Sequence, residues 1–192
     1  MAAMTIDLPP GKIILVNGAS SAGKSALARR LQSVIAGPFW NYSIDHLRAG
    51  KIVPFERIDN GEFRWSELRG QFFEGFHRSL PAFALAGNNL IVEYIVETRE
   101  WMDRLLELLE GLDVFFVGLH CALPELERRE AARGDRRIGE ARTDFETTHQ
   151  LCSYDLELDS TSTPVDEMVG ILLNAWNKRR APCAFERMQA RS

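Results

Sequence analysis

The chain has 192 residues, of which 45% are hydrophobic and 26% charged, and this composition excludes a disordered or collagen-like chain. The net charge of −4 and the pI near 5.6 argue against a protein that coats nucleic acid, because such proteins carry a basic face. The apolar runs are far shorter than the roughly 20 residues of a membrane helix. The first ten residues lack the basic and apolar regions of a secretory signal, so we expect a cytoplasmic protein with no membrane or nucleic-acid partner.

The three cysteines, Cys121, Cys152 and Cys183, form no C-x-x-C pair and are odd in number. A disulfide framework or a structural zinc site is therefore not expected, and we interpret them as free thiols. The four histidines are scattered and show no metal-ligand spacing.

Short apolar strands and amphipathic helices alternate along the chain. Lys12–Asn17 predicts a strand buried on both faces, and Lys24–Ala36 predicts the helix that follows it. Further strands are expected at Phe39–Ile44, Asn89–Val92, Asp113–Leu119 and Leu156–Leu158, and further helices at Trp65–Gly87, Arg99–Leu109, Leu123–Arg133, Glu140–Leu151 and from Thr163 to Trp176. This alternation predicts an α/β fold in one domain, residues 1–192, with a central parallel sheet flanked by helices on both faces.

Four local expectations complete this outline. Pro81 should kink or divide its helix, and residues 46–64, which show little periodicity, should form a long loop. Thr163 should cap the last helix, with Asp166 reaching back. The basic tail, residues 177–192, is interpreted as a solvated and partly disordered end.

A phosphate-binding motif follows the first strand. It matches G-x-x-x-x-G-K-[ST], the P-loop, and comprises Gly18, Ala19, Ser20, Ser21, Ala22, Gly23, Lys24 and Ser25. The glycines let the backbone wrap around phosphate oxygens, and the N–H groups of the loop and helix then face the anion. Lys24 would bridge the outer phosphates of ATP, and the Ser25 hydroxyl would bind Mg²⁺. The sequence therefore predicts ATP and Mg²⁺ as cofactors.

A P-loop alone does not separate kinases from ATPases and GTPases. A GTPase reads its base with N-K-x-D, and the Asn177-Lys178 pair here lacks the aspartate, which argues against a switch protein. Arg133-Gly134-Asp135-Arg136-Arg137 lies between two predicted helices, where small-molecule kinases carry a lid that closes arginines over the transferring phosphoryl group. We expect such a lid at about residues 133–139; a solvated basic turn is the alternative.

Two acidic residues stand at predicted strand ends, where ligands gather in parallel sheets. Asp45 follows the second strand and could take a proton from an attacking hydroxyl, or could cap a helix. Glu93 ends the third strand and could orient Mg²⁺-bound water, or could be simply a polar end residue.

The chain resembles the chloramphenicol phosphotransferase-like kinases over about residues 12–175. The resemblance rests on GASSAGKSALARRLQ, YSIDHL, VGLHC, the residues 127–136 around ARGDR, and SYDLELDST. It implies a P-loop kinase fold, with Asp45 as the base and Arg133 and Arg136 as lid arginines. It also implies that the loop containing Ser160 and Thr161 lies near the adenine.

The sequence departs from the family at Glu93-Tyr94, where the family has paired aspartates, and residues 48–88 match poorly. The resemblance implies transfer of the γ-phosphoryl group of Mg·ATP to a hydroxyl of a small molecule, with chloramphenicol as the expected acceptor and antibiotic inactivation as the outcome. A kinase of another metabolite or nucleotide is the alternative on the same scaffold. The non-enzymatic alternative is an ATP-binding regulatory module that uses the basic tail for docking. The sequence leaves the oligomeric state open.

Overall fold

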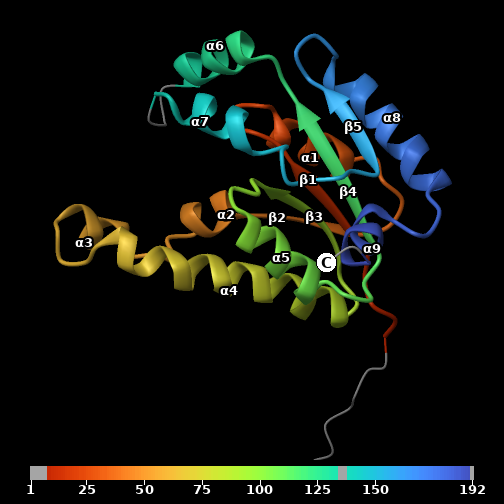
Figure 1. Ribbon diagram of the computed structural model, residues 1–192, viewed down its shortest axis with the longest axis horizontal. Helices are drawn as coiled ribbons and strands as arrows, with labels where there is room; N and C mark the ends of the chain where they lie inside the picture. Colours follow the sequence, from red (N-terminus) through yellow and green to blue (C-terminus); the bar gives the residue numbers. More distant parts are fainter. Residues whose placement is uncertain (1–7, 134–137, 191–192) are drawn as a thin grey trace, which may run out of the picture.

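A single parallel sheet organises the protein. The computed structural model describes residues 8–133 and 138–190. Its five strands follow the order β2-β3-β1-β4-β5, so the strand before the P-loop lies in the middle (Figure 1). They are β1 (Ile13–Asn17), β2 (Phe39–Ser43), β3 (Asn89–Tyr94), β4 (Val114–His120) and β5 (Leu156–Asp159), all paired in parallel. The predicted α/β class and parallel sheet are confirmed.

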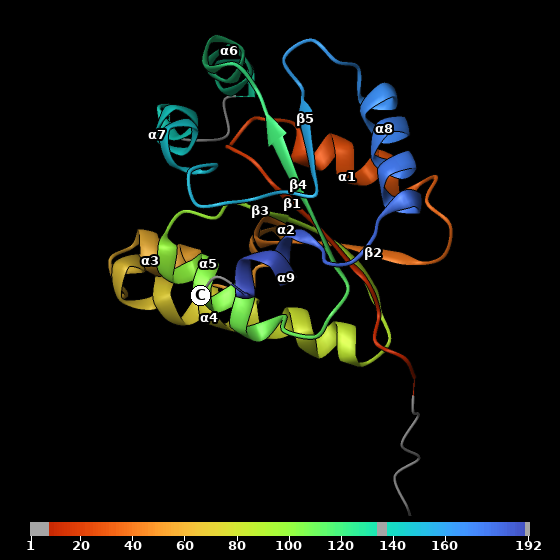
Figure 2. The same ribbon diagram turned by 45° about the vertical axis from the view of Figure 1, so that its right-hand side comes forward.

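Helices cover both faces of the sheet. α1 and α8 pack on one face and α4, α5 and α9 on the other, while α6 and α7 lie beyond the end of β4 (Figures 1 and 2). The helices are α1 (Lys24–Gln32), α2 (Ile44–Ala49), α3 (Phe55–Asp59), α4 (Trp65–Leu85), α5 (Arg99–Leu108), α6 (Leu123–Arg133), α7 (Glu140–Thr147), α8 (Val165–Lys178) and α9 (Ala184–Gln189). Within the described ranges, no helix has the length and apolar character needed to cross a membrane.

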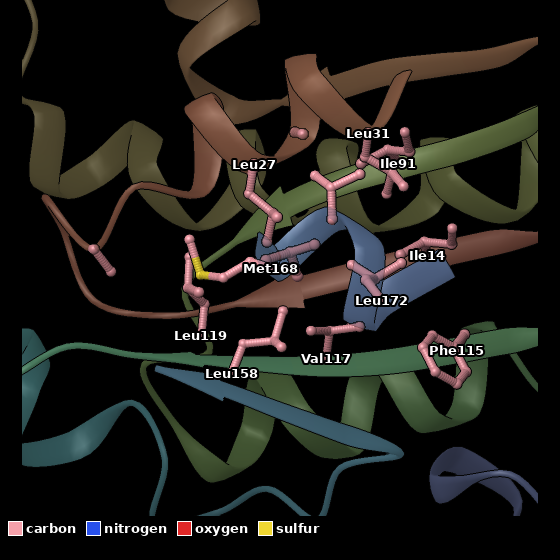
Figure 3. Packing of buried hydrophobic residues seen from close by; sticks show 14 of the residues in the cluster. Ile14, Leu27, Leu31, Ile91, Phe115, Val117, Leu119, Leu158, Met168 and Leu172 are labelled. Carbon is pink, nitrogen blue, oxygen red and sulfur yellow. The ribbon is translucent and has the colours of Figure 1, made fainter. Parts of the chain in front are cut away.

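The alternation of side chains along β1 explains why both faces are covered. Ile14 and Val16 point to the face of α1 and α8, and Ile13 and Leu15 point to the opposite face. All four are fully buried, so the strand reads as a continuous apolar run. Figure 3 shows Ile14 close to Leu172 of α8 in the first of these two layers.

The expectations for residues 46–87 were partly wrong. The predicted long loop contains the five-residue helix α3, and the six-residue helix α2 extends into it as far as Ala49. Helices this short do not complete the two or more turns over which a hydrophobic period becomes visible. α4 also continues through Pro81, although a proline inside a helix costs about 3 kcal/mol. Its buried residues Phe76, Leu80 and Ala84 pack on the sheet on both sides of the proline and offset that cost.

The expectations for the last third of the chain also need correction. Pro164 occupies the N-cap position of α8 without a side-chain cap, so Thr163 does not have the predicted role. Asp166 instead forms an ion pair with Arg30 of α1. The tail is not a solvated end as far as residue 190, because α9 packs under the sheet with Phe185 only 1% exposed. The ring of Phe185 meets Phe116 of β4 at a centroid distance of 5.1 Å.

Truncation of the α9 anchor tests this packing. We expect Phe185→Ala to lower the free energy of unfolding by about 3–5 kcal/mol, because it removes a fully buried aromatic side chain. The matched control is Arg180→Ala, an exposed tail residue whose loss should change stability by less than about 0.5 kcal/mol. Urea denaturation of both variants measures the difference, and equal stabilities would contradict the packing of the tail.

Candidate active site

The P-loop connects the end of β1 to the start of α1. A Cβ atom on Gly18 would lie 2.6 Å from the carbonyl oxygen of Leu119, so a larger residue would displace β4. Ser21 and Gly23 have φ angles of 64° and 96°, in the left-handed region that turns the chain back on itself. A loop with this conformation in front of a helix directs backbone N–H groups toward one anion.

Lys24 begins α1 and folds back over the loop. Its Nζ donates hydrogen bonds to the carbonyl oxygens of Gly18 at 2.7 Å and Ala19 at 2.8 Å. The N-cap, Gly23, supplies no side-chain cap, and the first turn of α1 carries no acidic residue. The start of α1 therefore combines the positive end of a helix dipole with an ammonium group, an arrangement that attracts an anion.

Ser25 and Glu93 meet behind the loop. The Ser25 Oγ donates to Glu93 Oε2 at 2.5 Å, and Glu93 is only 6% exposed. The pairing of β1 with β3 brings them together, because Val16 is the register partner of Glu93. A hydroxyl and a carboxylate are oxygen ligands that suit Mg²⁺, which usually takes one or two protein ligands and completes its shell with water and phosphate. In the described ranges no group of three or more His, Cys, Asp or Glu side chains is arranged to hold a metal ion without that help.

Asp45 lies in the first turn of α2, directly after β2. The capping role that the sequence left open belongs to Ser43, whose hydroxyl accepts the N–H of His46 at 3.2 Å. Asp45 is exposed and lines the same cleft as the P-loop residues. Asp45 therefore lies at the carboxyl edge of the sheet, in the same cleft as the P-loop.

A cleft of about 1070 Å³ joins these groups. The side toward the P-loop is lined by Ser20, Ser21, Gly23, Lys24, Ser25 and Glu93. The other side is built from α2 and α4, with Asp45, Arg48, Trp65, Arg69, Phe72 and Phe73. Gly18, Ala19 and Ala22, which belong to the predicted motif, do not line the cleft, and the two alanines are buried.

The α4 side of the cleft is aromatic. The Trp65 and Phe72 rings lie 5.6 Å apart between centroids, and Phe72 meets Phe73 edge-to-face at the same distance. The guanidinium group of Arg69 lies 4.6 Å from the centre of the Phe73 ring. Such a wall offers flat apolar surface together with cationic hydrogen-bond donors.

Burial tunes three titratable groups in this wall. Arg69 binds Glu97 at 2.6 Å, yet burial still raises the pKa of the Glu97 carboxyl above its ordinary value. The Tyr94 hydroxyl lies 2.6 Å from Nε2 of His77, and burial raises the pKa of Tyr94 while it lowers the pKa of His77 to about 4. The Tyr94–His77 pair is therefore neutral at neutral pH, and Arg48 and Arg69 supply the positive charge on this side of the cleft.

The two arginines that we predict to form a lid are placed only in part. Arg133 ends α6 and lines the cleft, whereas Arg136 lies outside the described residues. Sequence reasoning missed Arg129, one helical turn before Arg133. Its guanidinium donates to the carbonyl oxygens of Ser160 at 2.6 Å and Ala22 at 3.3 Å, and it also lines the cleft. The i, i+4 spacing of the two arginines on one helix face was the available signal.

Ser160 and Thr161 follow β5 and form hydrogen bonds with backbone groups of neighbouring segments. The Ser160 hydroxyl donates to the carbonyl oxygen of Ala22 at 2.7 Å and so supports the P-loop from below. The Thr161 hydroxyl accepts the N–H of Ala122 at 2.8 Å. Neither residue is among those that line the cleft, so the predicted contact with an adenine stays a prediction.

A carboxylate from α7 reaches the P-loop. Asp144 Oδ2 accepts the backbone N–H of Ser20 at 2.9 Å, although the two residues are 124 positions apart in the chain. This is one of the loop N–H groups that the motif would offer to a phosphate oxygen. Asp144 therefore occupies part of the predicted phosphate site, and no local sequence signal pointed to it.

The family assignment rests on the whole chain. A family model described as chloramphenicol phosphotransferase-like protein matches residues 11–177. The chain belongs to this family. It is 34% identical over 212 aligned residues to "Putative O-phosphotransferase Rv2636" of Mycobacterium tuberculosis, and the match covers 100% of this chain and 93% of that protein. Together with the P-loop cleft, this family membership makes the chain a small-molecule kinase.

Solved kinases share the fold of this family member. The APS kinase CysC of M. tuberculosis, solved with AMPPNP and APS, superposes with a TM-score of 0.66 and covers 88% of this chain and 99% of its own. A gluconokinase of Sinorhizobium meliloti gives a TM-score of 0.58 with 96% of each chain covered. Their sequence identities are 19% and 18%, so these likenesses establish the P-loop kinase fold.

The Asp144 contact predicts an effect on nucleotide affinity. Asp144→Asn removes a negative charge from the site that a phosphate oxygen would take, so we expect Mg·ATP to bind about tenfold more tightly, or about 1.4 kcal/mol. Isothermal titration measures the change. Glu146→Gln, an exposed carboxylate on the same helix, is the control and should leave the affinity unchanged. Weaker binding by Asp144→Asn would show that Asp144 supports the nucleotide instead of competing with it.

Proposed function

We propose that this enzyme transfers the γ-phosphoryl group of Mg·ATP to a hydroxyl group of a small molecule. The observation that carries the proposal is that the same cleft has the P-loop and the Ser25–Glu93 pair on one side and Asp45 beside an aromatic wall on the other. Donor and acceptor bound to these two sides would meet at the carboxyl edge of the sheet, where ligands of parallel α/β proteins bind.

The donor side supplies charge complementarity. The loop N–H groups, the start of α1 and Lys24 would hold the phosphates, with Lys24 exchanging its present carbonyl partners for phosphate oxygens. Ser25 and Glu93 would hold Mg²⁺, directly or through water, and the bound ion would neutralise charge on the phosphate oxygens. Arg133 would approach from α6 and balance negative charge on the transferring group.

Asp45 would act on the acceptor. Its carboxylate would accept a hydrogen bond from the attacking hydroxyl, align the oxygen with the phosphorus and take the proton late in the transfer. Ser43 already caps α2, so this carboxylate is not needed to start the helix.

Chloramphenicol, or a related hydroxylated compound, is the acceptor that we propose. The family resemblance and the family name favour it, and the Trp65, Phe72 and Phe73 wall offers flat apolar surface for a ring. The outcome would be antibiotic inactivation. Arg48 and Arg69 in the same wall favour a second candidate, an anionic hydroxylated metabolite, because a guanidinium group binds carboxylate or phosphate well.

A transfer assay tests this function. ATP and Mg²⁺ are incubated with chloramphenicol and with a panel of neutral and anionic hydroxylated metabolites, and mass spectrometry detects one added phosphoryl group. We expect product from the wild type and none from Lys24→Ala, which should still fold because Lys24 belongs to neither apolar layer of the core. Product from an anionic metabolite alone would select the second candidate, and no product from any acceptor would contradict the proposed function.

The Asp45→Asn variant tests whether Asp45 acts as a proton acceptor or only supports the structure. The amide keeps the size of the side chain but accepts no proton, so we expect the maximal rate to fall by about 10²–10⁴ while Mg·ATP affinity and unfolding stay near wild type. Ser43→Ala is the companion variant and should cost about 1 kcal/mol of stability through loss of the cap. A nearly normal rate for Asp45→Asn would remove Asp45 from the mechanism.

A further inference from the structure

A second buried carboxylate lies outside the groups used so far. Glu130 is on α6, a mostly polar helix whose buried residues are Leu126 and Glu130. Glu130 is only 3% exposed. A buried carboxylate is costly unless hydrogen-bond donors compensate its charge, so the partners of this group show what it does.

The partners of Glu130 are backbone groups at the start of α7. Oε2 accepts the N–H of Gly139 at 2.8 Å, and Oε1 accepts the N–H of Ala141 at 2.9 Å. These hydrogen bonds hold the pKa of Glu130 below its ordinary value, so the side chain is charged at neutral pH. Gly139 is the N-cap of α7, has a φ of 101° and provides no side-chain cap. Glu130 therefore caps α7 from a different helix, and its charge complements the N-terminus of that helix.

The capped helix, α7, forms part of the cleft wall. Glu140, Thr143 and Asp144 of α7 line the cleft, and Asp144 contacts the P-loop at Ser20. Arg133 lies three residues after Glu130 on α6. The carboxylate thus joins the helix that carries Arg133 to the helix that meets the P-loop.

We propose that Glu130 is a positioning residue, which locks α7 onto α6 so that Arg133 and the cleft-facing side of α7 keep a fixed relation to the P-loop. The proposal rests on the proposed phosphoryl transfer for its effect on rate. A second tie between the two helices, Arg142 with Glu127 at 2.6 Å, is largely exposed and is expected to contribute little. This exposed tie provides a matched control.

Glu130→Gln and Glu127→Gln are compared by two measurements. The first is hydrogen exchange of the α7 backbone, which needs no turnover. The second is a comparison of the change in kcat with the change in the Kd of Mg·ATP. For Glu130→Gln we expect exchange in α7 to rise at least about tenfold, with the central strands unchanged. We expect kcat to fall about 10- to 100-fold through misplaced groups, and Kd to change less than about threefold. Glu127→Gln should match the wild type in all three.

Several outcomes would overturn the proposal. Unchanged hydrogen exchange of α7 in Glu130→Gln would show that Glu130 does not cap this helix. Raised exchange with an unchanged kcat would show that Glu130 has a purely structural role. Parallel loss of kcat and nucleotide affinity would indicate general damage to the site. If Glu130→Gln does not fold, Glu130→Asp keeps the charge but shortens its reach, and the same readouts and expectations apply. Absence of transfer by the wild type would count against the proposed function, while α7 exchange would still decide whether Glu130 holds the helix.

Discussion

The buried amide of Asn17 is the interaction on which the site depends. Asn17 ends β1 directly before the P-loop and is fully buried. Its oxygen accepts the N–H of Val96 at 2.9 Å, and its nitrogen donates to the carbonyl oxygen of Thr148 at 2.9 Å and to the Tyr154 hydroxyl at 2.8 Å. One satisfied side chain thus ties the base of the donor loop to the segment before Glu97 and to the end of α7. A buried network of this kind rigidifies the groups that it joins.

The parallel sheet brings the P-loop and two carboxylates together in one place. The parallel strands deliver the P-loop, Asp45 and Glu93 to one edge, because each follows or ends a strand at the same side of the sheet. The helices α4 and α7 then close the cleft from opposite sides, with aromatic rings on one and carboxylates on the other. Lys24 lies on the P-loop side of the cleft, whereas the α4 side combines aromatic rings with the guanidinium groups of Arg48 and Arg69.

Local patterns predicted the fold well, and long-range contacts account for what was missed. The P-loop was recognisable because its conformational demands are encoded in eight consecutive residues, and the central strands because they are continuous apolar runs. The helices α2, α3 and α9 have five or six residues each, too few for a visible period. Asp144 and Arg129 reach the P-loop from 124 and 107 positions away, and no sequence window contains both partners. The cap by Glu130 was hidden for a related reason, because it joins two helices across a loop.

The most direct test of the account is the stereochemical course of transfer from ATP made chiral at the γ-phosphorus with oxygen isotopes. The account places the attacking hydroxyl beside Asp45 and the leaving oxygen over the P-loop, so a single in-line displacement should invert the configuration at phosphorus. Retention would require two displacements through a phosphorylated residue. That result would contradict the direct transfer and the role of Asp45 as proton acceptor.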